Sequence, residues 1–396
     1  MMAAFDQDAL PDGPLTGLRV LDVTKVWAGP MATALLADLG ADVIRVEMPG
    51  NREGLFPPEI PGTGLAWFRQ TTQRGKRSLA LDLRAEGAAD TLLGLVADVD
   101  VLVENYLPGT LARLGLGYAR CREVNPGLVY VSISGFGQYG PQSRRPGYDP
   151  IIQAASGWMA LNGEPGGRPL RSPTFIADDL AALYAVIGAL SALRHRDATG
   201  EGQHVDVALL DALLATSDGY LTLAAAGAQP GRQGDQTDMV VPAGVFRCAD
   251  DAYVYLAAAL DKHWRLFAQV IDRPELARAP GYATNAERVA NREAVNAVIG
   301  AWCATRTADE VQALLDARGL TAQRVRDLAE AAKDPHVLER GMLCDTTLSN
   351  GTVAPLTGPA IKFSRTPARI RSGAPEPGAH TGEILADPWS ERRRTP

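Results

Sequence analysis

The chain has 396 residues, of which 46% are hydrophobic and 21% are charged, and its formal net charge at pH 7 is -7. This composition is typical of a folded protein and excludes a disordered chain, which would have fewer apolar residues and more charge. The negative balance argues against nucleic acids or anionic membranes as general partners, because both select basic surfaces. The length predicts two or three domains.

The cysteines are widely spaced, with no CxxC pair and no histidine at the spacing of zinc ligands. They are Cys121, Cys248, Cys303 and Cys344. We therefore expect neither a metal site nor a disulfide framework. Residues 1–14 carry acidic side chains where a secretory signal has positive charge and an apolar run, and the most apolar stretches elsewhere are interrupted by Asp, Arg or Gly. The expected location is the cytoplasm, with no membrane-spanning helix.

The first half of the chain alternates between predicted strands and predicted helices. The first unit is a strand at 18–23, a turn at 28–30, a helix at 31–39 and a strand at 41–46. Further strands are expected at 78–83, 101–103 and 128–134, with a helix at 86–99. This alternation predicts an α/β fold with a parallel sheet between two layers of helices, and ligands at the carboxyl ends of the strands.

Beyond residue 150 the pattern becomes helical, with long helices expected at 180–194 and 205–226. Residues 227–238 are polar and rich in glycine without a hydrophobic period, so we expect a domain boundary there. The elements expected after it are strands at 245–248 and 253–257, helices at 263–271, 285–304 and 308–318, a largely helical stretch at 327–341, and strands at 352–359 and 361–364.

Three segments at predicted strand ends have side chains suited to an anionic ligand. The turn at 26–30 leads into a helix N-terminus, which attracts anions, although its single glycine does not match GxGxxG. The segment 74–77 holds three cations, and Asn and Tyr at 105–106 precede Arg113. These residue types bind phosphates and can hold a purine. Each segment is also compatible with an ordinary turn or a solvated charge cluster, so none is specific alone.

Two segments with carboxylates are candidates for chemistry. Tyr148-Asp149 reads as part of a turn before a helix, and Asp178-Asp179 precedes an apolar helix, which either aspartate can cap. A carboxylate there can instead be a nucleophile toward an acyl group, with the helix N-terminus stabilising negative charge. The local sequence does not decide between these roles. The histidines fit no catalytic triad and the cysteines lack an activating neighbour, which disfavours hydrolase and thiol chemistry.

Taken together, the motifs resemble those of the class III CoA-transferases, the family that includes formyl-CoA transferase, carnitine CoA-transferase and α-methylacyl-CoA racemase. The matching segments are LTGLRVLD at 15–22, AGP at 28–30, LGADVIRVE at 39–47, KRS at 76–78, VENY at 103–106, GALSAL at 188–193, TGEGQ at 199–203, VDVALLD at 205–211, DPHV at 334–337, RGM at 340–342 and HT at 380–381. They follow the family's order over nearly the whole chain, so the joint pattern is specific.

The resemblance implies a large Rossmann-like domain made of residues 1–226 and the returning segment 327–396, with a smaller α+β domain at 227–326. It also implies an interlocked, ring-like homodimer. CoA, acyl-CoA and an acceptor carboxylic acid are the implied substrates, with no tightly bound cofactor and no metal.

The resemblance also implies the site residues. Asp178, ten residues before Gly188, matches the catalytic aspartate, which leaves Asp179 as the expected helix cap. The positions matching CoA-binding residues are Val26, Trp27, Ala28, Lys76, Arg77, Asn105, Tyr106 and Arg113, and Tyr148 and Asp149 are expected at the acyl site. In the implied reaction Asp178 attacks the thioester to give a mixed anhydride, and then carries CoA as an aspartyl thioester.

Two other functions stay open. Racemase members remove the α-proton of a 2-methylacyl-CoA with a His-Asp pair, and this chain has Tyr148-Asp149 at that position. The tyrosine favours transfer, because a phenol does not exchange protons near neutral pH as imidazole does. The other alternative is a catalytically silent CoA-binding homologue, in which Asp178 would only cap its helix.

Overall fold

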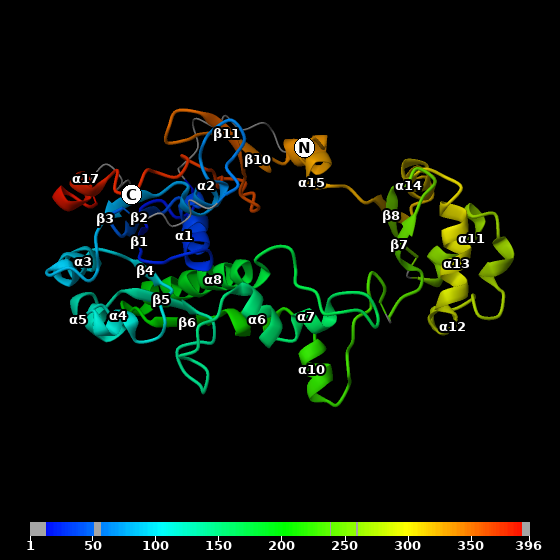
Figure 1. Cartoon of the computed structure of the whole chain (residues 1–396), viewed down its shortest axis with the longest axis horizontal. Helices are drawn as coiled ribbons and strands as arrows, with labels where there is room; N and C mark the ends of the chain where they lie inside the picture. Colours follow the sequence, from blue (N-terminus) through cyan, green and yellow to red (C-terminus); the bar gives the residue numbers. More distant parts are fainter. Residues whose placement is uncertain (1–12, 51–56, 238, 259, 390–396) are drawn as a thin grey trace. The chain divides into compact units, whose positions relative to one another are not determined.

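The computed structural model describes residues 13–50, 57–237, 239–258 and 260–389. The chain divides into two compact units, each described by itself (Figure 1). Unit 1 comprises Met1–Trp158, Arg171–Gly227 and Pro335–Pro396, and unit 2 comprises Met159–Leu170 and Ala228–Asp334.

The expected boundary at 226/227 lies one residue before the observed one, and two larger differences are found. Residues 327–334 belong to unit 2, because the ion pair of Arg324 with Glu330, at 2.7 Å, ties that stretch to the last strand of unit 2. Residues 159–170, expected in the large domain, also belong to unit 2. There the Gly163 carbonyl accepts a hydrogen bond from the Gly234 N–H at 3.0 Å.

Unit 1 contains a six-stranded sheet in the order β3-β2-β1-β4-β5-β6, with every pair of neighbours parallel. The strands are β1 (Arg19–Asp22), β2 (Asp42–Glu47), β3 (Arg77–Ala80), β4 (Val101–Glu104), β5 (Val129–Ser134) and β6 (His204–Ala208). The predicted parallel α/β sheet is thereby confirmed. This order is that of a Rossmann fold, in which the order reverses between β1 and β4 and ligands bind beside that switch point.

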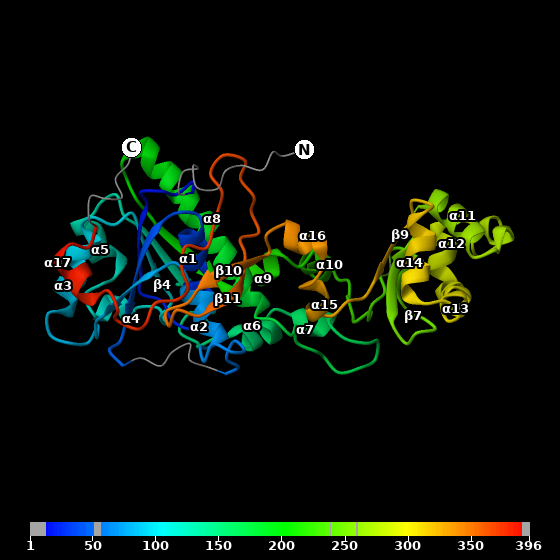
Figure 2. The same cartoon turned by 90° about the horizontal axis from the view of Figure 1, so that it is seen from above.

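Helices cover both faces of the sheet because successive apolar side chains of a strand point to opposite faces. Val20 packs in the core that contains α1 and α8, whereas Leu21 packs in the core that contains α3 and α5 (Figure 2). The helices of unit 1 are α1 (Ala28–Asp38), α2 (Trp67–Gln73), α3 (Ala88–Val96), α4 (Thr110–Arg113), α5 (Tyr118–Val124), α6 (Asp149–Ala155), α8 (Ile176–Thr199), α9 (Leu209–Ala215), α10 (Tyr220–Ala225), α16 (Pro335–Glu339) and α17 (Thr381–Ala386). The short α7 (Trp158–Leu161) spans the point where the chain passes from unit 1 to unit 2.

The helix expected at 205–226 is wrong. Residues 204–208 form β6 instead, since Val205 pairs with Val131 of β5 and completes the sheet. The remainder divides into α9 and α10, separated by Gly219, which has a φ of 85°. The strand expected at 361–364 is also absent from the described fold, because β11 (Val353–Thr357) pairs instead with β10 (Leu343–Thr347).

Helix α8 is long and apolar enough to cross a membrane by length and composition, with a mean hydropathy of 1.6 in its most apolar window. This corrects the expectation that no segment would pass such a test. Of that window, 44% is buried, and the buried residues pack against β5, β6, α1 and α9 in the core of unit 1.

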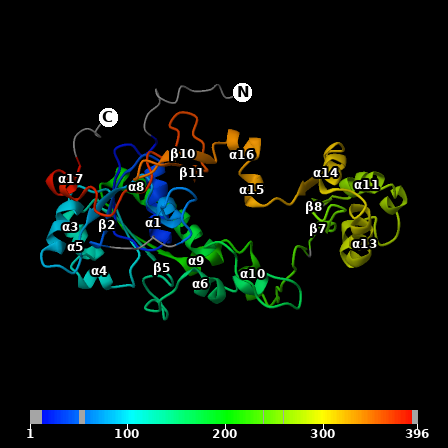
Figure 3. The same cartoon turned by 45° about the horizontal axis from the view of Figure 1, so that its top comes forward.

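Unit 2 is α+β (Figure 3). Its antiparallel sheet has the order β7-β8-β9, with β7 (Ala243–Arg247), β8 (Tyr253–Ala257) and β9 (Thr321–Arg324). Its helices are α11 (Asp261–Val270), a 3-10 turn at Pro274–Ala277, α12 (Asn285–Ala290), α13 (Arg292–Cys303), α14 (Ala308–Asp316) and α15 (Leu328–Ala331). The helix expected at 285–304 is thus interrupted at Asn291, and β9 was not expected.

Candidate active site

The loop between β1 and α1 lies at the switch point of the sheet, beside the carboxyl end of β4. The side-chain amide of Asn105, which follows β4, accepts a hydrogen bond from the Lys25 N–H and donates one to the Lys25 carbonyl, both at 2.7 Å. Val26 has a φ of 63°, in the left-handed region that a β-branched residue rarely adopts. The loop is therefore held in a strained conformation where this fold binds ligands.

Asp178 lies in the first turn of α8 and lines a cavity of about 260 Å³ beside this loop, which we call the Asp178 cavity. The other lining residues are Lys25, Val26, Trp27, Ala28, Asn105, Tyr106, Leu107, Ile133, Ser134, Gly135, Pro146, Gly147, Tyr148 and Leu209. Most of the site residues predicted from the sequence meet here. The exceptions are Lys76, Arg77, Arg113 and Asp149.

Asp149 holds the start of α8 from outside that helix. Its carboxylate is buried and accepts hydrogen bonds from the Ala177 N–H at 2.8 Å and from Gln153 Nε2 at 2.7 Å. The residue at the N-cap position, Phe175, makes no side-chain cap bond. The expectation that Asp179 caps α8 is therefore wrong. The structure also gives no support to Asp149 as a substrate contact, because its oxygens bond to the protein.

Trp27 joins the start of α1 to the start of α8. Its indole Nε1–H donates to the Asp179 carboxylate at 2.7 Å, and its ring packs among three other aromatic rings. The ring centres lie 5.5 Å away for Trp67, 4.8 Å for Phe68 and 5.0 Å for Phe175. Such edge and tilted contacts make a rigid cluster. The predicted CoA-binding residue Trp27 thus also positions the turn that carries Asp178.

Three carboxylates crowd the first turn of α8. Burial, the nearby charge of Asp149 and then that of Asp179 raise the pKa of Asp178 to about 8. Burial likewise raises the pKa of Asp149 and of Asp179, but their oxygens accept hydrogen bonds from Ala177 and Trp27. Of the residues that the structure describes, none donates a hydrogen bond to the Asp178 carboxylate. Perturbed carboxylates that line a cavity are typical of active sites.

A second cavity of about 480 Å³ adjoins the first, since Lys25 and Tyr106 line both. We call it the Arg84 cavity. Its charged lining residues are the cations Lys25, Arg45, Arg84 and Arg113 and the carboxylates Glu47 and Asp82, and its apolar residues are Val46, Met48, Leu81, Leu83, Tyr106 and Leu114. The Lys25 ammonium lies 4.6 Å from the centre of the Tyr106 ring. Cations beside an apolar surface suit a nucleotide that carries phosphates.

Sequence reasoning missed Lys25 and Arg84. The available signal was their position, because Lys25 follows β1 and Arg84 follows β3, at the ends of strands where ligands bind. Arg113, which was predicted, lines the Arg84 cavity and donates to the Thr110 hydroxyl at 3.1 Å.

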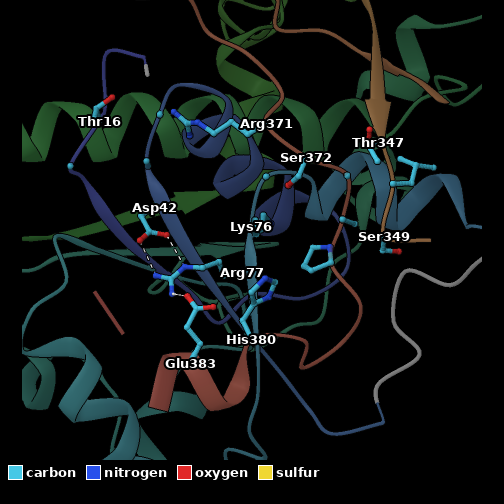
Figure 4. Close-up of a pocket in the computed structure, with 18 residues that line it drawn as sticks. Thr16, Asp42, Lys76, Arg77, Thr347, Ser349, Arg371, Ser372, His380 and Glu383 are labelled. Atoms are coloured by element: carbon cyan, nitrogen blue, oxygen red, sulfur yellow. Dashed lines mark hydrogen bonds and ion pairs between the residues drawn. The ribbon is translucent and has the colours of Figure 1, made fainter. Parts of the chain in front are cut away.

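Lys76 and Arg77 line neither of these cavities but a third one, of about 580 Å³, which Figure 4 shows. The Lys76 ammonium is buried and donates to the Asp22 carboxylate at 2.9 Å. Arg77 pairs with Asp42 at 2.8 Å and with Glu383 at 3.1 Å. The structure therefore gives no support to the prediction that these two residues hold CoA, because their charges are already paired within the protein.

Comparison with known proteins identifies the family. The profile of CoA-transferase family III matches residues 15–381. The chain belongs to CoA-transferase family III. It is therefore an enzyme that transfers CoA, and the resemblance drawn from the motifs is confirmed.

Named relatives of this family III chain match it along nearly their full length. Succinate–glutarate CoA-transferase of Agrobacterium fabrum is 35% identical over 395 residues, covering 97% of this chain and 98% of the relative. Succinyl-CoA:mesaconate CoA-transferase of Haloarcula hispanica is 36% identical over 383 residues, covering 94% of this chain and 96% of the relative. The crystal structure of a CAIB/BAIF family protein from Brucella suis is 34% identical, covers 95% of this chain and all of that one, and has a TM-score of 0.85.

Proposed function

We propose that this family III enzyme moves CoA from an acyl-CoA to a carboxylic acid through covalent intermediates on Asp178. One observation carries the proposal. Of the three carboxylates at the start of α8, Asp178 is the one that lines the cavity and whose oxygens accept no hydrogen bond from the described residues. Its place in the first turn of a helix of 24 residues also favours negative charge that develops nearby.

The proposed reaction exchanges one activated acyl group for another at each step. The Asp178 carboxylate attacks the thioester carbon and expels the CoA thiolate. The product is a mixed anhydride between Asp178 and the donor acyl group. The thiolate attacks the Asp178 carbonyl, releases the donor acid and forms an aspartyl-CoA thioester. The acceptor carboxylate then attacks that thioester to form a second anhydride, and the thiolate returns to the acceptor carbonyl. Asp178 is regenerated with no net change of protons.

Dicarboxylic acids are the proposed first substrates, because the printed names of two relatives combine succinate or succinyl-CoA with glutarate or mesaconate. Purified enzyme would be incubated with succinyl-CoA and each acid of a panel, and the acyl-CoA products separated by chromatography. We expect a new acyl-CoA to appear in proportion to succinate released. Release of free CoA without any new acyl-CoA would contradict transfer.

The racemase alternative predicts that solvent deuterium enters the α-carbon of a 2-methylacyl-CoA. Racemisation needs acid and base groups that exchange protons near neutrality, and no histidine occurs among the described residues that line the Asp178 cavity. Tyr148, at the matching position, lines the cavity with 65% of its surface exposed. We therefore expect no deuterium exchange above the rate without enzyme.

We propose that the CoA nucleotide occupies the Arg84 cavity and that the pantetheine arm passes Lys25 and Tyr106 to reach Asp178. Among the described residues, Arg84 forms an ion pair with Asp82, two residues earlier, and its Nη2 lies 3.6 Å from the Met48 sulfur. Such an exposed ion pair is weak in water. Arg84→Gln should raise KM for acyl-CoA about tenfold and leave kcat nearly unchanged, because it removes one phosphate contact worth about 1.4 kcal/mol.

Steady-state kinetics with CoA and with 3′-dephospho-CoA thioesters would test this placement. Arg120→Gln is the matched control, since the Arg120–Glu123 pair is exposed and lies outside both cavities. An Arg84 variant whose KM equals that of the control would contradict the placement of the nucleotide.

The raised pKa of Asp178 predicts the pH dependence of the reaction. Only the ionised carboxylate attacks, so kcat/KM should rise with pH until about pH 8 and then level off, as the pKa of about 8 requires. Asp149→Asn keeps an acceptor for the Ala177 N–H but removes the like charge, so the rise should move to lower pH. Profiles of kcat/KM between pH 5.5 and 9 would check both. An unmoved profile in the Asp149 variant would contradict this electrostatic account.

We further propose that the enzyme is a homodimer with interlocked chains, as the family resemblance implies. Apolar side chains of unit 1 remain exposed in the single chain, among them Leu183 (50%) and Ile187 (58%) one turn apart on α8. A contiguous exposed apolar surface is typical of an association site. Sedimentation equilibrium should give twice the 42.0 kDa of one chain, and a monomer at micromolar concentration would contradict the proposal.

A further inference from the structure

Ser134, the last residue of β5, has a buried hydroxyl that makes no hydrogen bond to any residue that the structure describes. The residue is 7% exposed and lines the Asp178 cavity, and its Oγ has no hydrogen-bond partner among the described residues. Nearly all buried polar side-chain atoms have a partner, because an unpaired one loses its hydrogen bonds to water without replacement. An unpaired buried hydroxyl in a cavity therefore calls for a ligand atom.

Ser132 shows the contrast two residues earlier on the same face of β5. Its hydroxyl lies 2.9 Å from His204 Nε2 of β6. The residue opposite Ser134 on β6 is Ala208, which has no polar side-chain atom. Strand β6 thus supplies a hydrogen-bond partner for the Ser132 hydroxyl but none for the Ser134 hydroxyl. A partner for Ser134 would have to come from a ligand in the cavity.

Two other side-chain donors at the Asp178 cavity are committed elsewhere, and the Lys25 ammonium lies over the Tyr106 ring. The Trp27 indole N–H donates to Asp179, and the Asn105 side-chain N–H donates to the Lys25 carbonyl. Tyr148 is largely exposed. Ser134 is therefore a buried donor that lines the same cavity as the proposed nucleophile and whose hydrogen is not used by the described residues.

We propose that the Ser134 hydroxyl donates a hydrogen bond to the acyl carbonyl oxygen of the thioester as Asp178 attacks, an inference that rests on the proposed function of Asp178. The attack forms a C–O bond to the acyl carbon, and the carbonyl π electrons move to the oxygen. When that oxyanion collapses, the C–S bond breaks and the thiolate takes its electrons. Ser134 keeps its proton throughout and stabilises the charge on the oxygen, as oxyanion-hole donors do.

The test is Ser134→Ala, with kcat and KM measured separately in the succinyl-CoA exchange assay. Removing one oxyanion donor typically lowers kcat by about 10²–10³-fold. We expect a loss of that size with little change in KM for acyl-CoA, and partial recovery of kcat in Ser134→Thr, which keeps a hydroxyl. Ser132→Ala is the matched control, because it removes a serine hydroxyl from the same strand, but one that already has a hydrogen-bond partner within the protein. It should lower Tm and leave kcat near that of the wild type.

Removal of an unpaired hydroxyl should not destabilise the fold, so Ser134→Ala should have a Tm at or above that of the wild type. A lower Tm would show that the hydroxyl has a partner in the protein and would overturn the proposal. An unchanged kcat in Ser134→Ala, together with an inactive Asp178→Asn enzyme, would also overturn the role of Ser134. That pair of results would still be compatible with the Asp178 mechanism. Activity in Asp178→Asn would instead overturn the mechanism itself.

Discussion

Asp178→Asn should lower kcat for CoA exchange by about 10⁴-fold or more, the scale on which removal of a covalent nucleophile acts. The asparagine amide keeps the shape of the side chain but forms neither the anhydride nor the thioester. The adjacent Asp179→Asn is the matched control, because the Asp179 carboxylate accepts the Trp27 N–H and its amide still offers an oxygen for that bond. We expect the control to lose far less activity.

The same variant should be more stable than the wild type at alkaline pH. The pKa of Asp178 is about 8 in the folded chain and close to its ordinary 3.8 in the unfolded chain, so the folded protein holds a proton that the unfolded chain releases. Asp178 therefore weakens the fold progressively as pH rises from about 4 to about 8, and above that range its effect stays constant because both states have lost the proton. The Tm of Asp178→Asn relative to wild type should increase between pH 6 and pH 9. Equal activity of variant and wild type, or a loss of Tm, would contradict the role given to Asp178.

The second large expected effect is a loss of stability when Asp22, which pairs with two buried cations near β1, is replaced. Asp22 is fully buried at the end of β1 and accepts from Lys76 at 2.9 Å and from Arg45 at 3.1 Å. Burial by itself raises the pKa of Asp22, but Lys76 and Arg45 outweigh it and hold the pKa far below its usual range. Asp22→Asn leaves two buried cations without their anion, which should reduce the free energy of unfolding by about 3–5 kcal/mol.

Urea unfolding followed by circular dichroism would measure this loss. Glu123→Gln, which breaks the exposed Arg120–Glu123 pair, is the control and should cost less than about 1 kcal/mol. A similar small loss for both variants would contradict the view that Lys76 is part of the buried structure. In that case Lys76 would return as a candidate to bind CoA.

Local patterns in the sequence predicted the β1-α1-β2 unit and the parallel sheet, because strands buried on both faces read as continuous apolar runs. They did not predict β6, since Val205–Ala208 continue directly into the apolar helix α9 and a short apolar run has no clear period. The partner of β6 is β5, far earlier in the chain, and pairing at that distance leaves no local signal.

Site residues could be predicted from the sequence where they belong to a family motif. The partners of those residues could not, because contacts between distant parts of the chain determine them. The family pattern singled out Asp178 and Asn105, and both line the Asp178 cavity. The side chain that caps α8 was not, because Asp149 lies 28 residues before the Ala177 that it bonds. The pairing of Lys76 could not be predicted for the same reason, since its partner Asp22 stands 54 residues away in the sequence. Charged residue types alone do not show which cations remain available to a ligand.

The most direct test of covalent catalysis by Asp178 is the intact mass of the enzyme after incubation with succinyl-CoA and no acceptor. Covalent catalysis should give a species heavier by one CoA less one water, and hydroxylamine should remove the CoA to leave a hydroxamate on the peptide that contains Asp178. The Asp178→Asn enzyme should give no such species. A wild-type enzyme that exchanges CoA at full rate without any adduct, or with an adduct on another residue, would contradict covalent catalysis by Asp178.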